Sequence, residues 1–320
     1  MSRLLFMRNL FLEWVHTRMS FNKSRAFLVA MLLWVGAFSQ PMADQIQVVA
    51  ITQDFASIAQ EIGGDLVEVQ PLIKGSRNLH HVTPRPSMVM KVKRADLLIR
   101  LGMGQDSWID GLIQVARNAR VFPGEHGYLD ASVPIRKLEI PDHDLDGSMG
   151  DVHQHGNPHY WLDPYNGVLI AAQIRDHLSQ LSPENRSEFE ANYQRFSTEL
   201  ERKAKVWNDQ LLAVKSQIFI TYHKVWSYFF EAFNLTSIGE LEPLPGIAPS
   251  IRHLSALKEQ VSELQGPFVV LMADYYPAPA GRGFAKQIDA RFVSAAPHVG
   301  EGDIDHYFDL FDTLVQAVLK

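Results

Sequence analysis

The chain has no cysteine among its 320 residues. This absence excludes a disulfide framework, a lipidated N-terminal cysteine and a zinc site built on thiolates. Any metal site in this protein must therefore use histidine, aspartate or glutamate side chains. The motif HExxH, in which two histidines of one helix bind zinc beside a catalytic glutamate, is also absent.

Basic charge is scarce as well. The sequence has 30 lysines and arginines against 36 aspartates and glutamates, a net charge of −6. Because nucleic-acid binding needs a basic surface, we expect no nucleic-acid partner. Hydrophobic residues make up 46% and charged residues 21%, which is typical of a globular protein. The length is enough for two domains.

A short apolar run near the N-terminus, Ala26 to Phe38, follows two basic residues and precedes small residues that end at Ala43. This order is typical of a secretory signal peptide, and the run is too short to span a bilayer. We predict a signal peptide over residues 1–43, or a shorter one that starts at Met19; a retained N-terminal anchor is the alternative. These residues hold five basic side chains and one acidic one, so cleavage changes the net charge from −6 to −10. The sequence therefore predicts a periplasmic protein.

Short apolar runs alternate with amphipathic stretches in two series. This alternation predicts parallel sheets with crossover helices. In the first series we expect strands at 46–52, 66–73 and 96–102 and helices at 53–64, 87–95 and 107–118. In the second series we expect strands at 216–223, 236–246, 267–276 and 293–300 and helices at 224–235, 249–264, 281–292 and 305–320.

A long helix is predicted between the two series, because Pro183 suits a first turn and apolar residues then recur at three- and four-residue steps. The predicted fold class is α/β, with two lobes of mostly parallel sheet joined by a long rigid linking helix. The expected divisions are an N-terminal lobe at 44–182, the linking helix at 183–214 and a C-terminal lobe at 215–320. A polar loop at 142–157 belongs to the N-terminal lobe.

Three of the thirteen histidines lie near the ends of predicted elements. His80 follows a strand by one loop, His159 precedes a helix and His223 ends a strand. Ligands of open α/β sheets bind beyond the carboxyl ends of strands, so these side chains can meet in one cleft. Neutral imidazoles are good zinc ligands, and nearby prolines restrict the backbone around two of the three. A lone histidine at such a position is nevertheless more often an ordinary hydrogen-bonded polar residue.

Three motifs in order, HHVTPRP, NPHYWLDP and ITYHKVW, resemble the zinc and manganese substrate-binding proteins of bacterial ABC importers. The resemblance covers nearly the whole chain after residue 43. It implies a fold of the cluster A-I type, with a metal ion held between the lobes. The family's His-x3-Pro-x-Pro pattern selects His80 rather than His81 as a ligand, and the other two motifs select His159 and His223.

The resemblance is to the zinc-binding, ZnuA-like members in particular, because manganese binders commonly place a carboxylate at the third position. It implies a monomeric periplasmic protein that carries Zn²⁺ to an ABC permease and is not an enzyme. A manganese or iron importer component, with Mn²⁺ as the alternative ion, is the nearest alternative. A secreted zinc hydrolase with water as the fourth ligand, and a metal buffer or adhesin without a transporter, are the others.

The fourth ligand is less well defined. The manganese binders use an aspartate on a loop in the last third of the C-terminal lobe. The matching region here contains His298, which is the first choice, and Asp303 and Asp305 are alternatives. Asp274, at the end of a predicted strand, is a further alternative, and water is another.

The loop at 142–157 contains His143, His153 and His155. It resembles a shortened form of the histidine-rich loop found in some zinc-binding members of the family. That resemblance implies an auxiliary role in metal capture. The alternative is a solvated polar loop whose histidines have no specific role.

Overall fold

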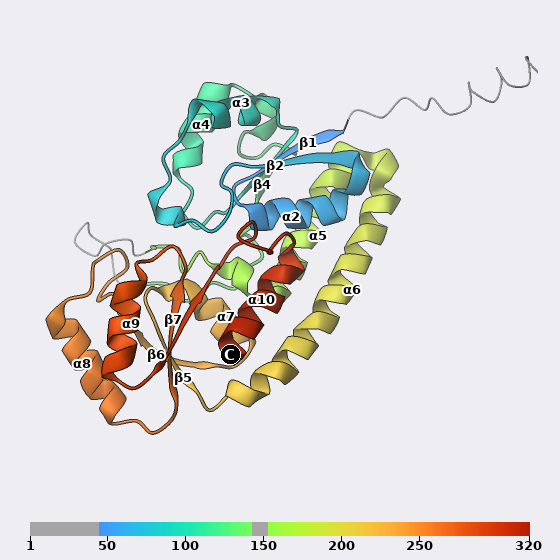
Figure 1. Cartoon of the computed structure of the whole chain (residues 1–320). Coiled ribbons are helices and arrows are strands. Elements are labelled where there is room, and N and C mark those ends of the chain that lie inside the picture. The colour runs from blue at the N-terminus through green and yellow to red at the C-terminus, as the bar shows by residue number, and fades with distance from the viewer. Residues whose placement is uncertain (1–44, 143–152) are drawn as a thin grey trace, which may run out of the picture. The chain divides into compact units, whose positions relative to one another are not determined.

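The structure, a computed structural model, describes residues 45–142 and 153–320 (Figure 1). The predicted signal peptide at 1–43 and His143 lie outside the described residues. Residues 45–320 form one compact unit. Within the part of the chain that the structure describes, no helix combines the length and apolar character needed to cross a bilayer.

The first sheet has four parallel strands in the order β2-β1-β3-β4. The strands are β1 (Ile46–Ala50), β2 (Val67–Pro71), β3 (Leu97–Arg100) and β4 (Tyr128–Asp130). The helices between them are α2 (Gln53–Gly63), α3 (Pro86–Arg94) and α4 (Trp108–Ala116). Strand β3 is buried along its whole length, as expected for a parallel sheet covered by helices.

The second sheet also has four parallel strands, in the order β6-β5-β7-β8. The strands are β5 (Ile218–Thr221), β6 (Thr236–Glu240), β7 (Phe268–Ala273) and β8 (Arg291–Ala295). The helices of this half are α7 (Ser227–Ala232), α8 (Ile251–Ser262), α9 (Ala278–Gln287) and α10 (Tyr307–Leu319). The two sheets therefore share one strand order, and within each sheet all the strands are parallel.

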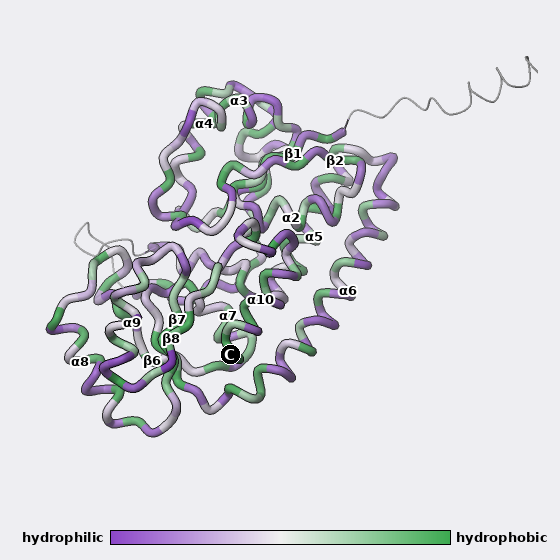
Figure 2. Tube along the Cα trace, in the orientation of Figure 1, coloured by the Kyte–Doolittle hydropathy of each residue, from purple (hydrophilic) through white to green (hydrophobic). Residues whose placement is uncertain are grey.

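Two long helices, α5 (Pro164–Leu181) and α6 (Arg186–Leu211), connect the halves. The predicted apolar stripe of α6 is buried at most positions, while its other face is hydrophilic (Figure 2). Helix α6 packs against α5, α2 and α10 (Figure 1). Near its end the Trp207 indole and the Lys203 ammonium both donate hydrogen bonds to Asp312 of α10, at 2.7 and 2.6 Å.

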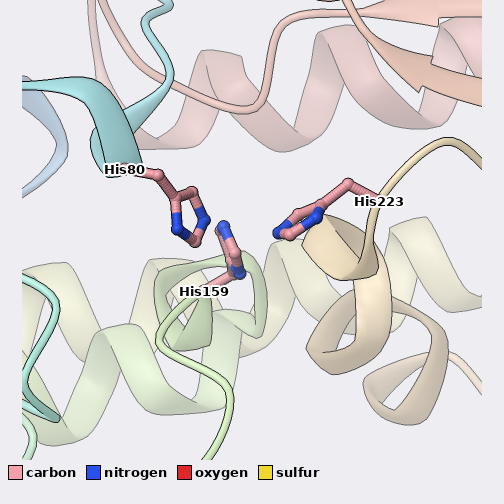
Figure 3. A group of neighbouring side chains, drawn as sticks. All are labelled: His80, His159 and His223. Atoms are coloured by element: carbon pink, nitrogen blue, oxygen red, sulfur yellow. The ribbon is translucent and has the colours of Figure 1, made fainter. Parts of the chain in front are cut away.

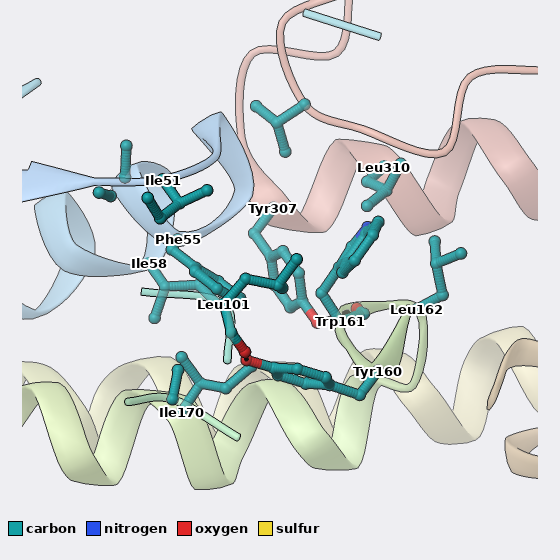
Figure 4. Close-up of a cluster of buried hydrophobic side chains, with 14 of the residues drawn as sticks. Ile51, Phe55, Ile58, Leu101, Tyr160, Trp161, Leu162, Ile170, Tyr307 and Leu310 are labelled. Atoms are coloured by element: carbon teal, nitrogen blue, oxygen red, sulfur yellow. Dashed lines mark hydrogen bonds between the residues drawn. The ribbon is translucent and has the colours of Figure 1, made fainter. Parts of the chain in front are cut away.

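The segment after residue 157 is anchored to both halves of the chain. The Tyr160 hydroxyl donates to the carbonyl of Leu101, just after β3, at 2.7 Å. The Trp161 indole donates to the carbonyl of Pro297, after β8, at 2.8 Å. Both rings are completely or almost completely buried, and they pack with Phe55 and Tyr307 in the larger hydrophobic core (Figure 4). This core fixes the backbone of the NPHYWLDP motif.

The predicted fold class is confirmed, including the long helix between the two sheets. Several element bounds differ from the sequence-based expectation, and two differences are the clearest. Strand β4 was not predicted, because only three residues form it, and Arg291 and Phe292 begin β8 rather than ending a helix. Short 3-10 turns fill several connections: η2 (Gly64–Leu66), η3 (Leu79–His81), η4 (Ala119–Val121), η5 (Tyr160–Leu162), η6 (Pro183–Asn185), η7 (Leu212–Val214) and η8 (Lys224–Trp226).

Candidate metal site

The side chains of His80, His159 and His223 come together in space. Each offers one nitrogen, and these nitrogens all lie within 4.8 Å of one another. The ring centroids are separated by 5.8 Å between His80 and His159, 5.0 Å between His80 and His223, and 5.6 Å between His159 and His223. Figure 3 shows the three rings converging from three separate segments of the chain.

His80 comes from the first half of the chain. It lies in the 3-10 turn η3, which follows β2 and is capped by Asn78, whose side-chain oxygen accepts a hydrogen bond from the His80 backbone N–H at 2.9 Å. The buried side chain of Leu79 attaches this turn to the core. His80 is half-buried, whereas the adjacent His81 is exposed. The turn therefore directs the first histidine inward and the second outward.

His159 is held by an asparagine two residues earlier. The side-chain oxygen of Asn157 accepts hydrogen bonds from both the backbone N–H and the Nδ1 of His159, each at 2.9 Å. The amide nitrogen of Asn157 donates to the Lys224 carbonyl at 2.7 Å and to the Glu139 carboxylate at 2.8 Å. These acceptors fix which way the amide points, so its oxygen must face His159. The His159 side chain is buried and cannot rotate freely.

His223 directly follows strand β5 and is also buried. Its Nδ1 donates to the carboxylate of Glu242, just after the neighbouring strand β6, at 2.8 Å. The Gly246 backbone N–H donates to the same oxygen of Glu242 at 3.2 Å. The ends of two adjacent parallel strands thus supply a histidine and the acceptor that orients its ring.

These contacts decide the tautomers of two rings. An oxygen acceptor at Nδ1 requires Nδ1 to carry the proton, which leaves the lone pair of Nε2 for a metal ion. Metal-binding histidines almost always have such an acceptor behind them. Asn157 beside His159, and Glu242 beside His223, therefore provide the acceptors that metal-binding histidines require.

The environment also keeps two of the rings unprotonated. Burial, with the neighbouring His223 as a smaller cause, lowers the pKa of His80 to about 2. Burial likewise holds the pKa of His159 well below its usual range, and the charges of the other histidines act in the same direction. Since only neutral imidazole binds metal, these two candidate ligands would not have to lose protons to bind an ion at neutral pH.

The donor set fits zinc. Three imidazole nitrogens that meet beside a cavity match the tetrahedral, nitrogen-rich coordination that zinc prefers, with one position left for a further donor. Manganese is a harder ion and favours carboxylate oxygens. Among the described residues, the group of mutually close donors contains no carboxylate.

A cavity of about 590 Å³ opens beside these rings, and His153, His159 and His223 contribute to its wall. The wall also contains four carboxylates, those of Glu139, Asp142, Glu240 and Glu242, and one basic side chain, Lys224. A cavity with this excess of negative charge attracts a divalent cation toward the histidines.

The structure does not bring His298 into the group of three. His298 lies in the loop after β8, where its Nδ1 donates to the carboxylate of Asp54 at 2.7 Å. Its ring stacks on the Trp161 ring, with centroids 4.7 Å apart. The centroids of the Trp161 and His159 rings are 5.4 Å apart. The Asp54 bond and the Trp161 stack orient the His298 ring, which lies outside the group of three.

The three aspartates considered as alternatives also lie outside the group. Asp303 and Asp305 are exposed on the loop before α10. Asp274 follows β7, is exposed, and accepts a hydrogen bond from the Ser76 hydroxyl. That bond joins a loop of the first half of the chain to the second half, which is a structural role.

Two of the loop histidines are within the described residues. His155 is exposed. His153 is half-buried, and its ring lies 4.9 Å from the ring of His80, with burial and His223 lowering its pKa to about 4. The loop therefore brings one histidine beside the three-histidine group and leaves the other in solvent.

Sequence reasoning missed the groups that orient the rings, namely Asn157, Glu242 and Asp54. Glu242 is 19 residues from His223, and Asp54 is 244 residues from His298. Nothing in the sequence links such distant residues. Asn157 is different, because it lies within the NPHYWLDP stretch. Its amide, two residues before His159, was a local signal that this side chain could orient the ring.

Comparison with known proteins identifies the family of the chain. The family described as zinc-uptake complex component A, periplasmic (ZnuA), matches residues 48–320. The high-affinity zinc uptake system protein ZnuA of Yersinia pestis is 26% identical over 308 residues, which cover 91% of this chain and 94% of that protein. The manganese ABC transporter substrate-binding lipoprotein PsaA of Streptococcus pneumoniae is 24% identical over 251 residues, 76% of this chain and 77% of that protein.

A solved structure has the same fold. The crystal structure of a ZnuA protein superposes with a TM-score of 0.71 at 24% sequence identity, covering 86% of this chain and 98% of that one. The two parallel sheets and the long connecting helix are thus an architecture already seen in an experimental structure.

Proposed function

The chain belongs to the family of periplasmic component A of zinc-uptake complexes, and from this premise we propose that it binds Zn²⁺ and delivers it to the membrane permease of an ABC importer. The protein acts outside the cytoplasm, in the periplasm, after removal of residues 1–43. It is a monomer that carries a metal ion and performs no chemistry on it.

One observation carries the proposal. His80, His159 and His223 offer three nitrogens within 4.8 Å of one another, from three distant parts of the sequence. Two of these rings have Nδ1 bound to an acceptor, so that Nε2 is free to bind the ion. Such alignment costs ordering free energy, which a cargo ion offsets on binding. These three histidines are the proposed zinc ligands.

The choice of zinc over manganese rests on the donor atoms. A site of three imidazoles favours zinc, whereas a manganese site contains more oxygen. The relative named as a manganese transporter component keeps Mn²⁺ as the alternative cargo. The lobes at 44–182 and 215–320, with the linking helix at 183–214, provide the two sides of the proposed cleft.

A calorimetric titration of the metal-free protein lacking residues 1–43 tests this function. We expect a zinc site of one ion per chain that involves all three histidines, with Mn²⁺ bound far more weakly. Binding of Mn²⁺ as tight as that of Zn²⁺ would replace the proposed cargo. Unchanged zinc binding in a variant that combines His80→Ala, His159→Ala and His223→Ala would refute the site itself.

A further inference from the structure

The ring of His153 lies beside the three-histidine group. Its ring centroid is 4.9 Å from that of His80, which matches the 5.0 Å between His80 and His223. Rings that share one tetrahedral zinc, with bonds of about 2.0–2.1 Å to nitrogen, have centroids roughly 5 Å apart. His153 also lines the cavity beside His159 and His223.

The Nε2 of His153 has no hydrogen-bond partner among the described residues, although it is buried. The Nε2 of His80 is in the same condition. A buried polar atom without a partner is unfavourable and in native proteins usually marks a bound water, an ion or a functional group. Two such nitrogens on neighbouring rings indicate one shared ligand between them.

The backbone at His153 is coupled to the site. The carbonyl of His153 accepts a hydrogen bond from the Gly156 N–H at 3.2 Å, which closes a turn. Gly156 has a φ of 97°, and a side chain there would meet the Leu138 carbonyl at 2.8 Å, so the turn requires glycine. The next residue, Asn157, orients His159. One short segment thus positions both His153 and the acceptor for His159.

We propose that His153 is the fourth zinc ligand of this protein, in place of a donor from the second half of the chain. The inference rests on the proposed function, since it assigns His153 to the fourth coordination position of the same zinc site. The His153 nitrogen lies outside the group of three mutually close donors among the described residues. The proposal requires the side-chain torsions of His153 to change when zinc binds.

His298 is the competing candidate. Its Nε2 is also buried and without a partner among the described residues. Its ring contacts Trp161 rather than any of the three histidines, and its Nδ1 is bound by Asp54. His153 has direct ring contact with a proposed ligand and His298 does not, which decides between them.

The test compares His153→Ala with His155→Ala, an exposed histidine of the same turn. The affinity for Zn²⁺ is measured by competition with a chromogenic chelator, and X-ray absorption of the zinc-loaded protein counts the imidazoles. We expect His153→Ala to weaken zinc binding at least about tenfold and to lower the imidazole count from four to three. His155→Ala should change neither quantity.

Two results would overturn the inference. One is an imidazole count that His153→Ala leaves unchanged, including the case in which His298→Ala lowers it instead. The other is equal loss of affinity in His153→Ala and His155→Ala, which would indicate a general effect of the loop. Failure of the proposed function is distinct, because His223→Ala would then leave zinc binding intact. Circular dichroism of each variant confirms that it is folded.

Discussion

The two sheets have the same strand order, but they supply the site in different ways. In the second sheet, His223 after β5 is held by Glu242 after the adjacent strand β6. In the first sheet, Asp54 after β1 holds no ligand of its own half but binds His298 of the other. The proposed ligand of the first half, His80, follows β2 and is held mainly through its backbone turn.

This difference shows that topology and orientation are separate problems. Strand order brings loop ends to one edge, but a ring becomes a prepared ligand only when a second group fixes it. The second half supplies a His223 ring oriented by Glu242, while the first half presents a half-buried His80 whose Nε2 has no hydrogen-bond partner among the described residues. We expect His80 to be the ligand that moves most between the metal-free and the zinc-bound protein.

The largest expected effect is loss of a ligand. His223→Ala and His80→Ala should each weaken zinc binding by more than about 100-fold, since removal of an outer-shell partner alone typically costs 10- to 100-fold. His81→Ala, an exposed neighbour, is the matched control and should bind zinc normally. Competition titrations measure all three variants. An equal loss in His81→Ala would contradict the assignment of His80.

The second prediction separates the two carboxylates. Glu242→Ala removes the acceptor of a proposed ligand and should weaken zinc binding about 10- to 100-fold. Asp54→Ala removes the acceptor of His298 and should leave zinc affinity unchanged, while lowering the free energy of unfolding by about 1–3 kcal/mol. Zinc titration and urea unfolding of both variants provide the measurements. If Asp54→Ala weakened zinc binding and Glu242→Ala did not, His298 rather than His223 would be the zinc ligand.

The third prediction concerns pH and the metal-free protein. The pKa of His80 is lowered to about 2 in the folded state, below the usual value of about 6.5 in the unfolded chain. Below pH 6.5 the unfolded chain therefore binds a proton that the folded protein does not, and stability decreases as the pH falls. The slope from His80 is about 1.4 kcal/mol per pH unit, or about 2 kcal/mol at pH 5.

Urea unfolding between pH 7 and pH 5 measures this slope. His80→Asn should reduce this slope by the contribution of one ring, while His159 and His153, whose pKa values are also lowered, continue to contribute; His81→Asn should leave it unchanged. A slope that is the same in His80→Asn and in the unmodified protein would show that the burial of His80 does not control its protonation.

The smallest expected effect concerns the N-terminal caps of two helices, α2, which carries Asp54, and α8. The Thr52 hydroxyl caps α2 by accepting from the Phe55 N–H at 3.5 Å, and the Ser250 hydroxyl caps α8 by accepting from the His253 N–H at 3.2 Å. Thr52→Ala and Ser250→Ala should each lower the free energy of unfolding by about 1 kcal/mol. Thermal unfolding measures both. A change of zinc affinity in either variant would contradict the view that these caps stabilise the fold without orienting ligands.

The sequence was sufficient to predict the architecture and to select the three converging histidines. Alternating apolar runs predict parallel strands and crossover helices, and strand ends determine where side chains such as His223 can meet. These are local signals. They are strong in a helix such as α2, because its 11 residues are enough for the apolar spacing to recur several times. Three-residue strands such as β4 carry too few positions for a pattern to be read.

The remaining parts of the site depend on contacts between distant residues. The partners Glu242 and His223, or Asp54 and His298, are close only after both strand ends have been placed in one cleft. The position of His298 behind Trp161 depends on how that indole packs between the halves. Local sequence patterns do not contain this information, so the expected fourth ligand could be chosen only by resemblance.

The most direct test of the central claim is anomalous diffraction at the zinc edge from crystals of the zinc-loaded protein. The account predicts one strong peak about 2.0–2.1 Å from a ring nitrogen of each of His80, His159 and His223. A peak elsewhere, or one that touches fewer than these three rings, would contradict it.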